Sequence, residues 1–365
     1  MITIASILRT NPIPRPRKRR LSRPISSLWL ALPLVLLVAT RGDTRDTATY
    51  IDIFRSTTQF PLNPLDYYAE NGVEWGFGLL SWTLSSIGLG PTSLFLVVSA
   101  ATFFFVARTA QRLGMGFYEV MPFYLGTFFL SQQLMQIRQG LGVSFAFWVL
   151  VGLATSSDRR WRLAFSTAIA AMLHVVSLVP LFAAVILRPL LPQPHRWRIA
   201  IWALALIIGC TLLARVIGTL QVLDSFERLT AYAADDEYGS ARNLFDPANV
   251  RAVFLLVLLL AACMAEPLAR SRAYVMLLGL YALHVGIRLG FLDFQILSGR
   301  LSTAVGFAEV FLLPMAVCIC VKARGLRALI GIAYLIVHAT ATLTIQTPSL
   351  IDDYFTPLHA NHAAH

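Results

Sequence analysis

The chain has 365 residues, a formal net charge of +11, 57% hydrophobic residues and 13% charged residues. An ordinary soluble domain carries about 25% charged residues, so this composition excludes a soluble globular protein and indicates a protein that has membrane lipids as its solvent. The Lys and Arg residues lie in short clusters between apolar segments. That pattern is a topology signal, and we expect no nucleic-acid partner.

The first 24 residues form a basic tail. The run Pro14–Arg20 precedes an apolar run, Leu28–Ala39, and together they resemble the n-region and h-region of a signal sequence. Many further apolar segments follow. They favour an uncleaved first membrane helix over a cleaved signal, with residues 1–24 as a cytoplasmic N-terminal tail.

Apolar segments recur along the rest of the chain. A bilayer core about 30 Å thick needs roughly 17–25 apolar residues per helix, and no strand-type alternation runs through these segments, so they are predicted to be helices. They cover residues 25–40, 75–90, 91–107, 117–134, 138–155, 163–187, 199–220, 250–266, 273–292, 301–321 and 326–346.

These segments predict an all-α fold, a polytopic transmembrane helical bundle of about 9–11 membrane segments that include re-entrant or interfacial helices. We expect a single transmembrane domain at 25–346. Its longer polar gaps, 41–74 and 221–249, are net acidic and are placed outside by the positive-inside rule. A C-terminal tail follows at 347–365.

The count of crossings singles out the segment 75–90. Glu74 is placed outside and Arg108 inside, which requires an odd number of crossings, yet two apolar segments separate them. The segment 75–90 is short and contains three serines. We therefore predict that it is an interfacial or re-entrant helix on the outer side.

The segment 163–187 raises the same difficulty, because both of its flanks are basic. Two readings stay open. In one, the segment is a hairpin of two short helices with His174 at the bend. In the other, it is one long helix that violates the charge rule. Broken helices at membrane depth are tolerated only where they are buried in protein or line a watery cavity, so a bend would be a candidate site.

Several ionisable side chains in or beside the apolar segments converge on the predicted outer side. Arg138, Arg288 and Arg300 are among them. Ionisable groups are expensive at membrane depth, and the planar guanidinium suits phosphate oxygens, so these arginines could hold a pyrophosphate. The alternative is that each one extends to the lipid headgroups.

Two further groups are candidates for proton transfer. Glu74 lies close enough to the bilayer for desolvation to raise its pKa, as a general base requires. The alternative is that its carboxylate only interacts favourably with the dipole at the N-terminus of the following helix. His174 is either a base or a packing residue. We expect His284 and His338 to be packing residues, and Arg251 and Glu309 to be members of structural ion pairs.

No cofactor or metal site is predicted. The four cysteines, Cys210, Cys263, Cys318 and Cys320, lie inside apolar segments without a spacing suited to zinc, and they are read as buried thiols.

Several short motifs, in order, resemble the EpsG family of exopolysaccharide biosynthesis membrane proteins, which are related in kind to Wzy polysaccharide polymerases. Asp46 to Tyr50 is similar to the family's Asp-x-x-x-Tyr, and Glu74 to Leu80 to its Glu-x-Gly-aromatic run. Ile137–Gly142 and Leu173–Leu178 are similar to its Arg-Gln and His-x-x-Ser segments, and Ser298–Leu301 is a weaker match. The chain has Gly142 where the family usually has Ala.

The resemblance implies a polysaccharide polymerase-like membrane glycosyltransferase. Such an enzyme joins undecaprenyl-pyrophosphate-linked oligosaccharide repeat units at the outer face of the bacterial inner membrane, for exopolysaccharide or O-antigen biosynthesis. Other polysaccharide assembly proteins are candidate partners. A transporter or flippase of lipid-linked glycans, an O-antigen ligase and a non-catalytic scaffold subunit are the alternatives, although we find no repeated halves of the kind typical of transporters.

Under this interpretation, Arg138 and Arg300 stabilise the departing pyrophosphate, and Glu74 or His174 accepts the proton of the acceptor hydroxyl. The further candidates are Asp46 as a reserve base, Gln139 and Arg288 as substrate-binding residues, and Tyr50 and Trp75 as rings that stack on sugars. For the aromatic residues, anchoring at the membrane interface is an equal alternative.

Overall fold

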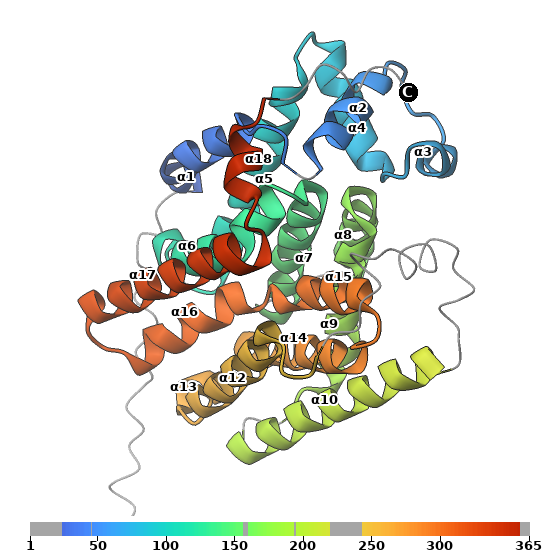
Figure 1. Cartoon of the computed structure of the whole chain (residues 1–365). Coiled ribbons are helices and arrows are strands. Elements are labelled where there is room, and N and C mark those ends of the chain that lie inside the picture. The colour runs from blue at the N-terminus through green and yellow to red at the C-terminus, as the bar shows by residue number, and fades with distance from the viewer. Residues whose placement is uncertain (1–23, 45, 156–159, 193–194, 220–242, 358–365) are drawn as a thin grey trace, which may run out of the picture.

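The structure is a computed structural model that describes residues 24–44, 46–155, 160–192, 195–219 and 243–357 (Figure 1). Within these ranges the regular structure is helical and contains no strand, which confirms the predicted all-α fold. The N-terminal tail and most of the predicted outer loop 221–249 lie outside the described residues.

The helices in the first half are α1 (Pro24–Ala39), α2 (Thr47–Ser56), α3 (Pro64–Asn71), α4 (Trp75–Ser86), α5 (Pro91–Arg112), α6 (Phe117–Tyr124), the π-helix η2 (Leu125–Gln133), α7 (Ile137–Thr155), α8 (Arg160–Leu173), the short η3 (Val175–Ser177) and α9 (Leu178–Leu190). Those in the second half are α10 (Arg196–Thr219), α12 (Pro247–Ala262), α13 (Glu266–Ala269), α14 (Arg272–Gly290), α15 (Gln295–Gly306), α16 (Glu309–Cys320), α17 (Arg324–Ala341), η5 (Thr342–Gln346) and α18 (Leu350–Phe355).

Six helical stretches in the described residues are long and apolar enough to cross a membrane. They are Pro91–Arg112, Ile137–Ala154, Arg196–Ile217, Arg272–Gly290, Ser298–Cys320 and Arg324–Gln346. Shorter apolar helices, such as Pro247–Ala262, accompany them. The chain is therefore a membrane protein built of helices, as its composition predicts.

The spanning helices differ in how much of their apolar surface is buried inside the protein. In α7 and α14 more than four fifths of the apolar window is buried inside the protein, whereas in α10 and α17 less than one fifth is. A helix that is apolar yet exposed requires lipid around it. Thus α7 and α14 form the centre of the bundle, and α10 and α17 lie at its lipid-facing edge (Figure 1).

The segment 75–90 contains α4, which has 12 residues. At 1.5 Å per residue this helix is about 18 Å long, too short to cross a bilayer core of about 30 Å. The prediction that this segment does not cross as an ordinary span agrees with the structure. Figure 1 shows α4 beside α2 and α3 at one end of the molecule.

The polar gap 41–74 contains α2 and α3, which the sequence analysis did not predict. Tyr50, Ile53 and Phe54 of α2 are buried, and α2 packs on α4 and α5. In α3, the side chain of Asn63 accepts a hydrogen bond from the amide of Leu65 and caps the helix. These helices were missed because their apolar residues are few and only tertiary contacts complete their burial.

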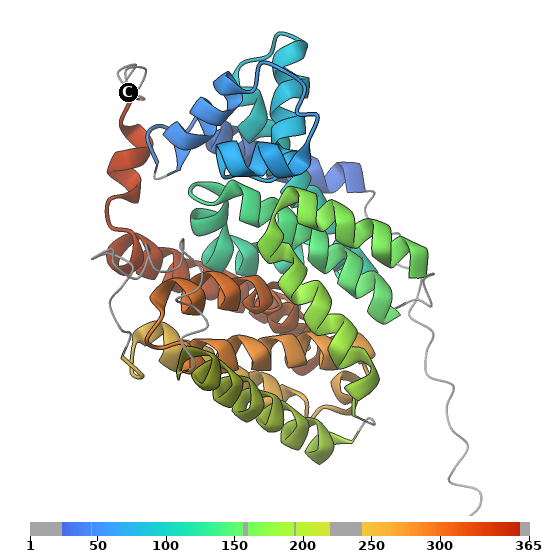
Figure 2. The ribbon, with the colours of Figure 1, turned by 90° about the vertical axis from the view of Figure 1, so that its right-hand side faces the viewer.

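The segment 163–187 is broken. Helix α8 ends at Leu173, His174 has an extended backbone with φ −169° and ψ 125°, and α9 begins at Leu178. Figure 2 shows the two green helices leaving the bend in different directions. The predicted pair of short helices is confirmed, and the alternative of one long helix is wrong.

The end of α1 contacts two segments that are distant in sequence. Gly42, just after α1, donates its amide to the carbonyl of Tyr354 at 2.9 Å, close to α18. Arg41 donates to the carbonyl of Gln133 at 2.7 Å, at the turn between η2 and α7. The end of α1 is therefore held by both the C-terminal helix α18 and the turn before α7.

Candidate functional site

Glu74 is the centre of a buried ionic cluster that joins three segments far apart in the sequence. Its Oε2 accepts a hydrogen bond from Nη1 of Arg138 at 2.8 Å. Its Oε1 lies 2.5 Å from Nδ1 of His174 and accepts from the amide of Val175 at 3.1 Å. Three of the predicted site residues, Glu74, Arg138 and His174, are thus brought together. We call them the Glu74 cluster.

The helix break at His174 positions the imidazole. A broken helix leaves backbone groups without their usual partners, and the hydroxyl of Ser177 satisfies two of them by donating to the carbonyls of Ala170 at 2.7 Å and His174 at 2.6 Å. Glu74 accepts from the amide of Val175 on the other side of the break. The His-x-x-Ser motif therefore builds the bend, and Glu74 holds it.

Two glycines of the quoted motifs let the neighbouring helices approach this bend. A Cβ at Gly76 of α4 would lie 2.6 Å from the carbonyl oxygen of Met172, and a Cβ at Gly142 of α7 would lie 2.9 Å from Cβ of His174. Both distances are shorter than any ordinary carbon contact. Gly142, where the family usually has Ala, is therefore explained by the close contact of α7 with the bend.

The electrostatics of Glu74 differ from the prediction. Burial raises the pKa of the Glu74 carboxyl, but the hydrogen bond and charge of His174 and the charge of Arg138 outweigh burial and lower it from 4.5 to about 2. The predicted rise is therefore wrong. Glu74 also makes no capping hydrogen bond to its own helix α4. At neutral pH Glu74 is an ionised partner that orients other groups and a poor proton acceptor.

His174 and Arg138 keep hydrogen-bonding capacity that Glu74 does not use. Because Glu74 is ionised, Nδ1 of His174 carries a proton and donates it; in the neutral form of the imidazole, Nε2 is then the nitrogen with a free lone pair. In Arg138, Nε has no partner in the described part of the chain. The guanidinium carbon of Arg138 lies 5.6 Å from the ring centre of Tyr50 and 5.9 Å from that of Phe77.

The other predicted site residues have different positions relative to the Glu74 cluster. Gln139 donates to the carbonyl of Arg300 at 3.4 Å, which brings α15 against α7 beside the Glu74 cluster. Asp46 precedes α2, one turn before Tyr50. Arg288, by contrast, is buried and its Nε donates to Asn249 of α12 at 2.9 Å. Arg288 thus joins α14 to α12, and its part in binding a pyrophosphate stays a prediction.

Of the two aromatic residues, Tyr50 does not fit the predicted stacking on sugars, whereas stacking by Trp75 stays a prediction. Tyr50 is 2% exposed, so its ring lies beneath Arg138 and cannot stack on a sugar. Trp75 is half-buried and donates its indole N–H to the carbonyl of Pro61 at 2.6 Å. That bond anchors the segment between α2 and α3 to the residue that follows Glu74.

A polar cleft lies between α2 and α3, close in sequence to Glu74. Its volume is about 390 Å³. Hydroxyl, amide, carboxyl and aromatic groups line it, from Ser56, Thr57, Thr58, Gln59, Phe60, Pro61, Leu62, Asn63, Asp66, Tyr67, Glu70 and Asn71. Such groups can hydrogen-bond to sugar hydroxyls and pack on sugar rings. This cleft was not predicted, because its walls come from α2, α3 and the segment between them, which carry no hydropathy signal.

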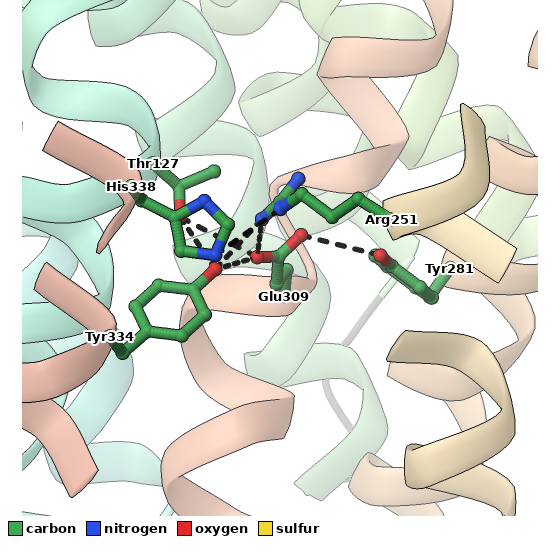
Figure 3. A network of polar contacts seen from close by, with 6 residues as sticks. All are labelled: Thr127, Arg251, Tyr281, Glu309, Tyr334 and His338. Carbon is green, nitrogen blue, oxygen red and sulfur yellow. Dashed lines mark hydrogen bonds and ion pairs between the residues drawn. The ribbon is translucent and has the colours of Figure 1, made fainter. Parts of the chain in front are cut away.

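A second ionic network joins α12, α14, α16, α17 and η2 (Figure 3). The carboxylate of Glu309 pairs with Arg251 and accepts from the hydroxyl of Tyr334, while its other oxygen accepts from Tyr281 at 3.4 Å. The predicted structural ion pair of Arg251 and Glu309 is thus confirmed. The other members of this network are Thr127, which bonds Tyr334, and His338, which accepts from Arg251.

His284 is buried, and its Nδ1 lies 2.7 Å from the carbonyl of Ser302, as expected of a packing residue. Among the described residues, no group of three or more His, Cys, Asp or Glu side chains could hold a metal ion. The four cysteines are free thiols; three are buried or half-buried, but Cys320 is exposed, so its prediction as buried is wrong.

Comparisons with known proteins give one match. The family model described as the EpsG family matches residues 25–358, nearly the whole chain. No curated protein and no solved structure matches the chain.

Proposed function

Because the chain belongs to the EpsG family, we propose that it is a polysaccharide polymerase-like membrane glycosyltransferase with the Glu74 cluster as its catalytic centre. It joins lipid-pyrophosphate-linked oligosaccharide repeat units at the outer face of the bacterial inner membrane. The observation that carries the proposal is the contact of Glu74 with both Arg138 and His174, which unites a candidate base and a candidate anion-binding group on one carboxylate.

In the proposed reaction, Nε2 of His174 accepts the proton of an acceptor sugar hydroxyl. The hydroxyl oxygen attacks the anomeric carbon of the donor and forms the new glycosidic bond. The bond from that carbon to the lipid pyrophosphate breaks, and the pyrophosphate leaves with the electron pair. Glu74 stays ionised throughout, holds the imidazole and stabilises its protonated form, as a carboxylate does beside a catalytic histidine.

Arg138 has the complementary role. Its fixed positive charge and its unpartnered Nε suit the charge that develops on the leaving pyrophosphate. Arg300, on the neighbouring α15, is the second candidate for this contact. The cleft between α2 and α3 is where we propose that the acceptor glycan binds, because Trp75 ties its wall to the segment of Glu74.

The test is complementation of a strain that lacks this protein. Glu74→Gln and Arg138→Ala are expected to leave single repeat units on the lipid carrier in place of polymer, with the protein level unchanged. Glu266→Gln is the matched control, because Glu266 also pairs with an arginine but is 59% exposed; it should support normal polymer. Normal polymer length and yield from both cluster variants would refute the assignment.

The same strain separates the alternatives. Loss of a flippase leaves repeat units on the inner leaflet, and loss of an O-antigen ligase leaves finished polymer on the carrier. A polymerase defect instead leaves single units exposed on the outer leaflet. Polymer that accumulates on the carrier in the Glu74→Gln strain would therefore favour a ligase.

A further inference from the structure

Arg41 carries a buried positive charge that has no carboxylate at ion-pair distance in the described part of the chain, although the charge of Asp46 acts on it from farther away. Its side chain is 4% exposed. One guanidinium nitrogen donates to the carbonyl of Gln133 at 2.7 Å, while Nε and the other terminal nitrogen have no partner. The guanidinium carbon lies 3.7 Å from the ring centre of Phe95. No ion pair within the described ranges includes this arginine.

Two glutamines beside Arg41 are also buried and also have polar atoms without hydrogen-bond partners. Gln132 and Gln133 are completely buried, and none of their side-chain amide atoms meets hydrogen-bond geometry with a partner; the buried hydroxyl of Tyr124 lies beside the amide of Gln133. They face Gly140 of α7, where a Cβ would lie 3.1 Å from Nε2 of Gln133. We call Arg41, Gln132 and Gln133 the Arg41 group.

Buried polar groups without partners lower the stability of the folded protein unless a ligand binds to them. A buried polar atom without a partner costs about 1–3 kcal/mol, and folded proteins contain few of them. A buried charge without a partner costs more. Here the unpartnered atoms are gathered in three side chains around one turn, which is typical of a ligand-binding site and untypical of packing.

The chemistry of the group selects an anion. A guanidinium and amide N–H groups are donors, and the guanidinium fork matches the oxygens of a phosphate. The group also adjoins the Glu74 cluster, because the ring of Tyr50 lies 5.9 Å from the guanidinium carbon of Arg41 and 5.6 Å from that of Arg138. Both arginines keep unused donors.

We propose that the Arg41 group is a phosphate-binding subsite that holds the pyrophosphate of the lipid-linked donor. The identity of the ligand rests on the proposed function, whereas the subsite itself rests on the unpartnered buried groups. Arg41 and Arg138 then bind the pyrophosphate together, and Arg138 lies nearer the group that accepts the proton.

The test uses the purified full-length protein in nanodiscs of phosphatidylcholine, with inorganic pyrophosphate as the probe. Pyrophosphate should raise the unfolding temperature in a saturable way. Arg41→Gln should weaken this binding at least tenfold. Arg215→Gln, which removes an exposed arginine paired with Asp293, should leave it within twofold. Equal pyrophosphate affinity in Arg41→Gln and the unmodified protein overturns the proposal.

A second variant guards against a defect in folding. Gln132→Met with Gln133→Met replaces unpartnered amides by apolar groups of similar shape. Without ligand the unfolding temperature should stay the same or rise, because no hydrogen bond is lost, while the stabilisation by pyrophosphate should fall. A lower unfolding temperature in the absence of ligand would instead show that these amides pack and do not bind, and would overturn the proposal.

A lipid headgroup carries the same phosphate chemistry, so a further arm replaces part of the phosphatidylcholine by phosphatidylglycerol. If anionic lipid alone gives the full stabilisation and pyrophosphate adds nothing, the ligand is a headgroup and the pyrophosphate assignment is wrong. Failure here is separable from failure of the proposed function, because polymer formation by Glu74→Gln is measured in cells and does not depend on Arg41.

Discussion

Glu74 and Glu309, two carboxylates buried in the described part of the chain, each pair with an arginine and each have a histidine nearby, yet their surroundings differ. Around Glu309 the partners are themselves engaged: Tyr334 bonds Thr127, and Arg251 bonds His338 (Figure 3). Around Glu74, the partners Arg138 and His174 keep unused nitrogens.

This difference separates a structural network from a candidate site. A polar network whose members are all satisfied rigidifies a core, and the one at Glu309 connects α12, α14, α16, α17 and η2. The Glu74 cluster lies at a helix break, a place where backbone irregularity at membrane depth signals function. Both carboxylates are buried. The Glu74 cluster therefore differs from the network at Glu309 in whether the surrounding side chains have all their hydrogen-bond partners.

The strongest test of this comparison replaces each of the two histidines, His174 and His338, by alanine in separate variants. His174→Ala removes the proposed base and should lower the polymerisation rate about 100- to 10,000-fold. His338→Ala should leave the rate within a few fold, because His338 belongs to the satisfied network. The measurement is the rate of polymer formation by purified protein in nanodiscs, with protein folding checked by its unfolding temperature. Equal losses in the two variants would break the distinction.

The next test acts on stability. Glu309→Gln leaves the half-buried Arg251 without its counter-charge and should destabilise the protein by about 3 kcal/mol. The double variant Glu309→Leu with Arg251→Met removes both charges and should recover most of that loss. Denaturant unfolding in detergent measures both. A single variant that loses less than 1 kcal/mol would argue against a structural role for the network.

The pKa of Glu74 gives a pH dependence. The folded-state value of about 2 lies below the ordinary 4.5, so ionisation of Glu74 stabilises the folded protein above pH 4.5, and this stabilisation is lost as the pH falls from 4.5 to about 2. The shift corresponds to roughly 3 kcal/mol. Unfolding temperatures measured across this range should fall less steeply in Glu74→Gln than in the unmodified protein. Parallel curves would contradict the ionised pair.

The smallest expected effect concerns the packing of the bend. Gly142→Ala places a Cβ against His174 and should cost about 1–3 kcal/mol through overpacking. It should also lower the polymerisation rate, since the imidazole must move. Gly209→Ala is the matched control, because a Cβ there meets nothing within 4 Å in helix α10; its effect should be neutral or slightly stabilising. Equal behaviour of the two variants would mean that the bend tolerates displacement.

The sequence predicted the parts of the fold that a bilayer constrains. Apolar length identifies the membrane helices, and the parity of charged flanks pointed to the short α4 and to the break at His174. Motif order likewise identified Glu74, Arg138 and His174 before their contact was seen. The sequence did not predict α2 and α3, because helices in a polar gap have no run of apolar residues that would identify them.

The sequence by itself therefore determined that this is a helical membrane protein and which ionisable residues need an explanation, because apolar length and the cost of a charge in lipid are local properties. Only the tertiary structure decided how those residues are used. The low pKa of Glu74, the bond of Arg288 to Asn249 and the unpartnered Arg41 all depend on which helices, distant in sequence, meet. Hydrogen bonding and desolvation are set by those neighbours, and composition does not encode them.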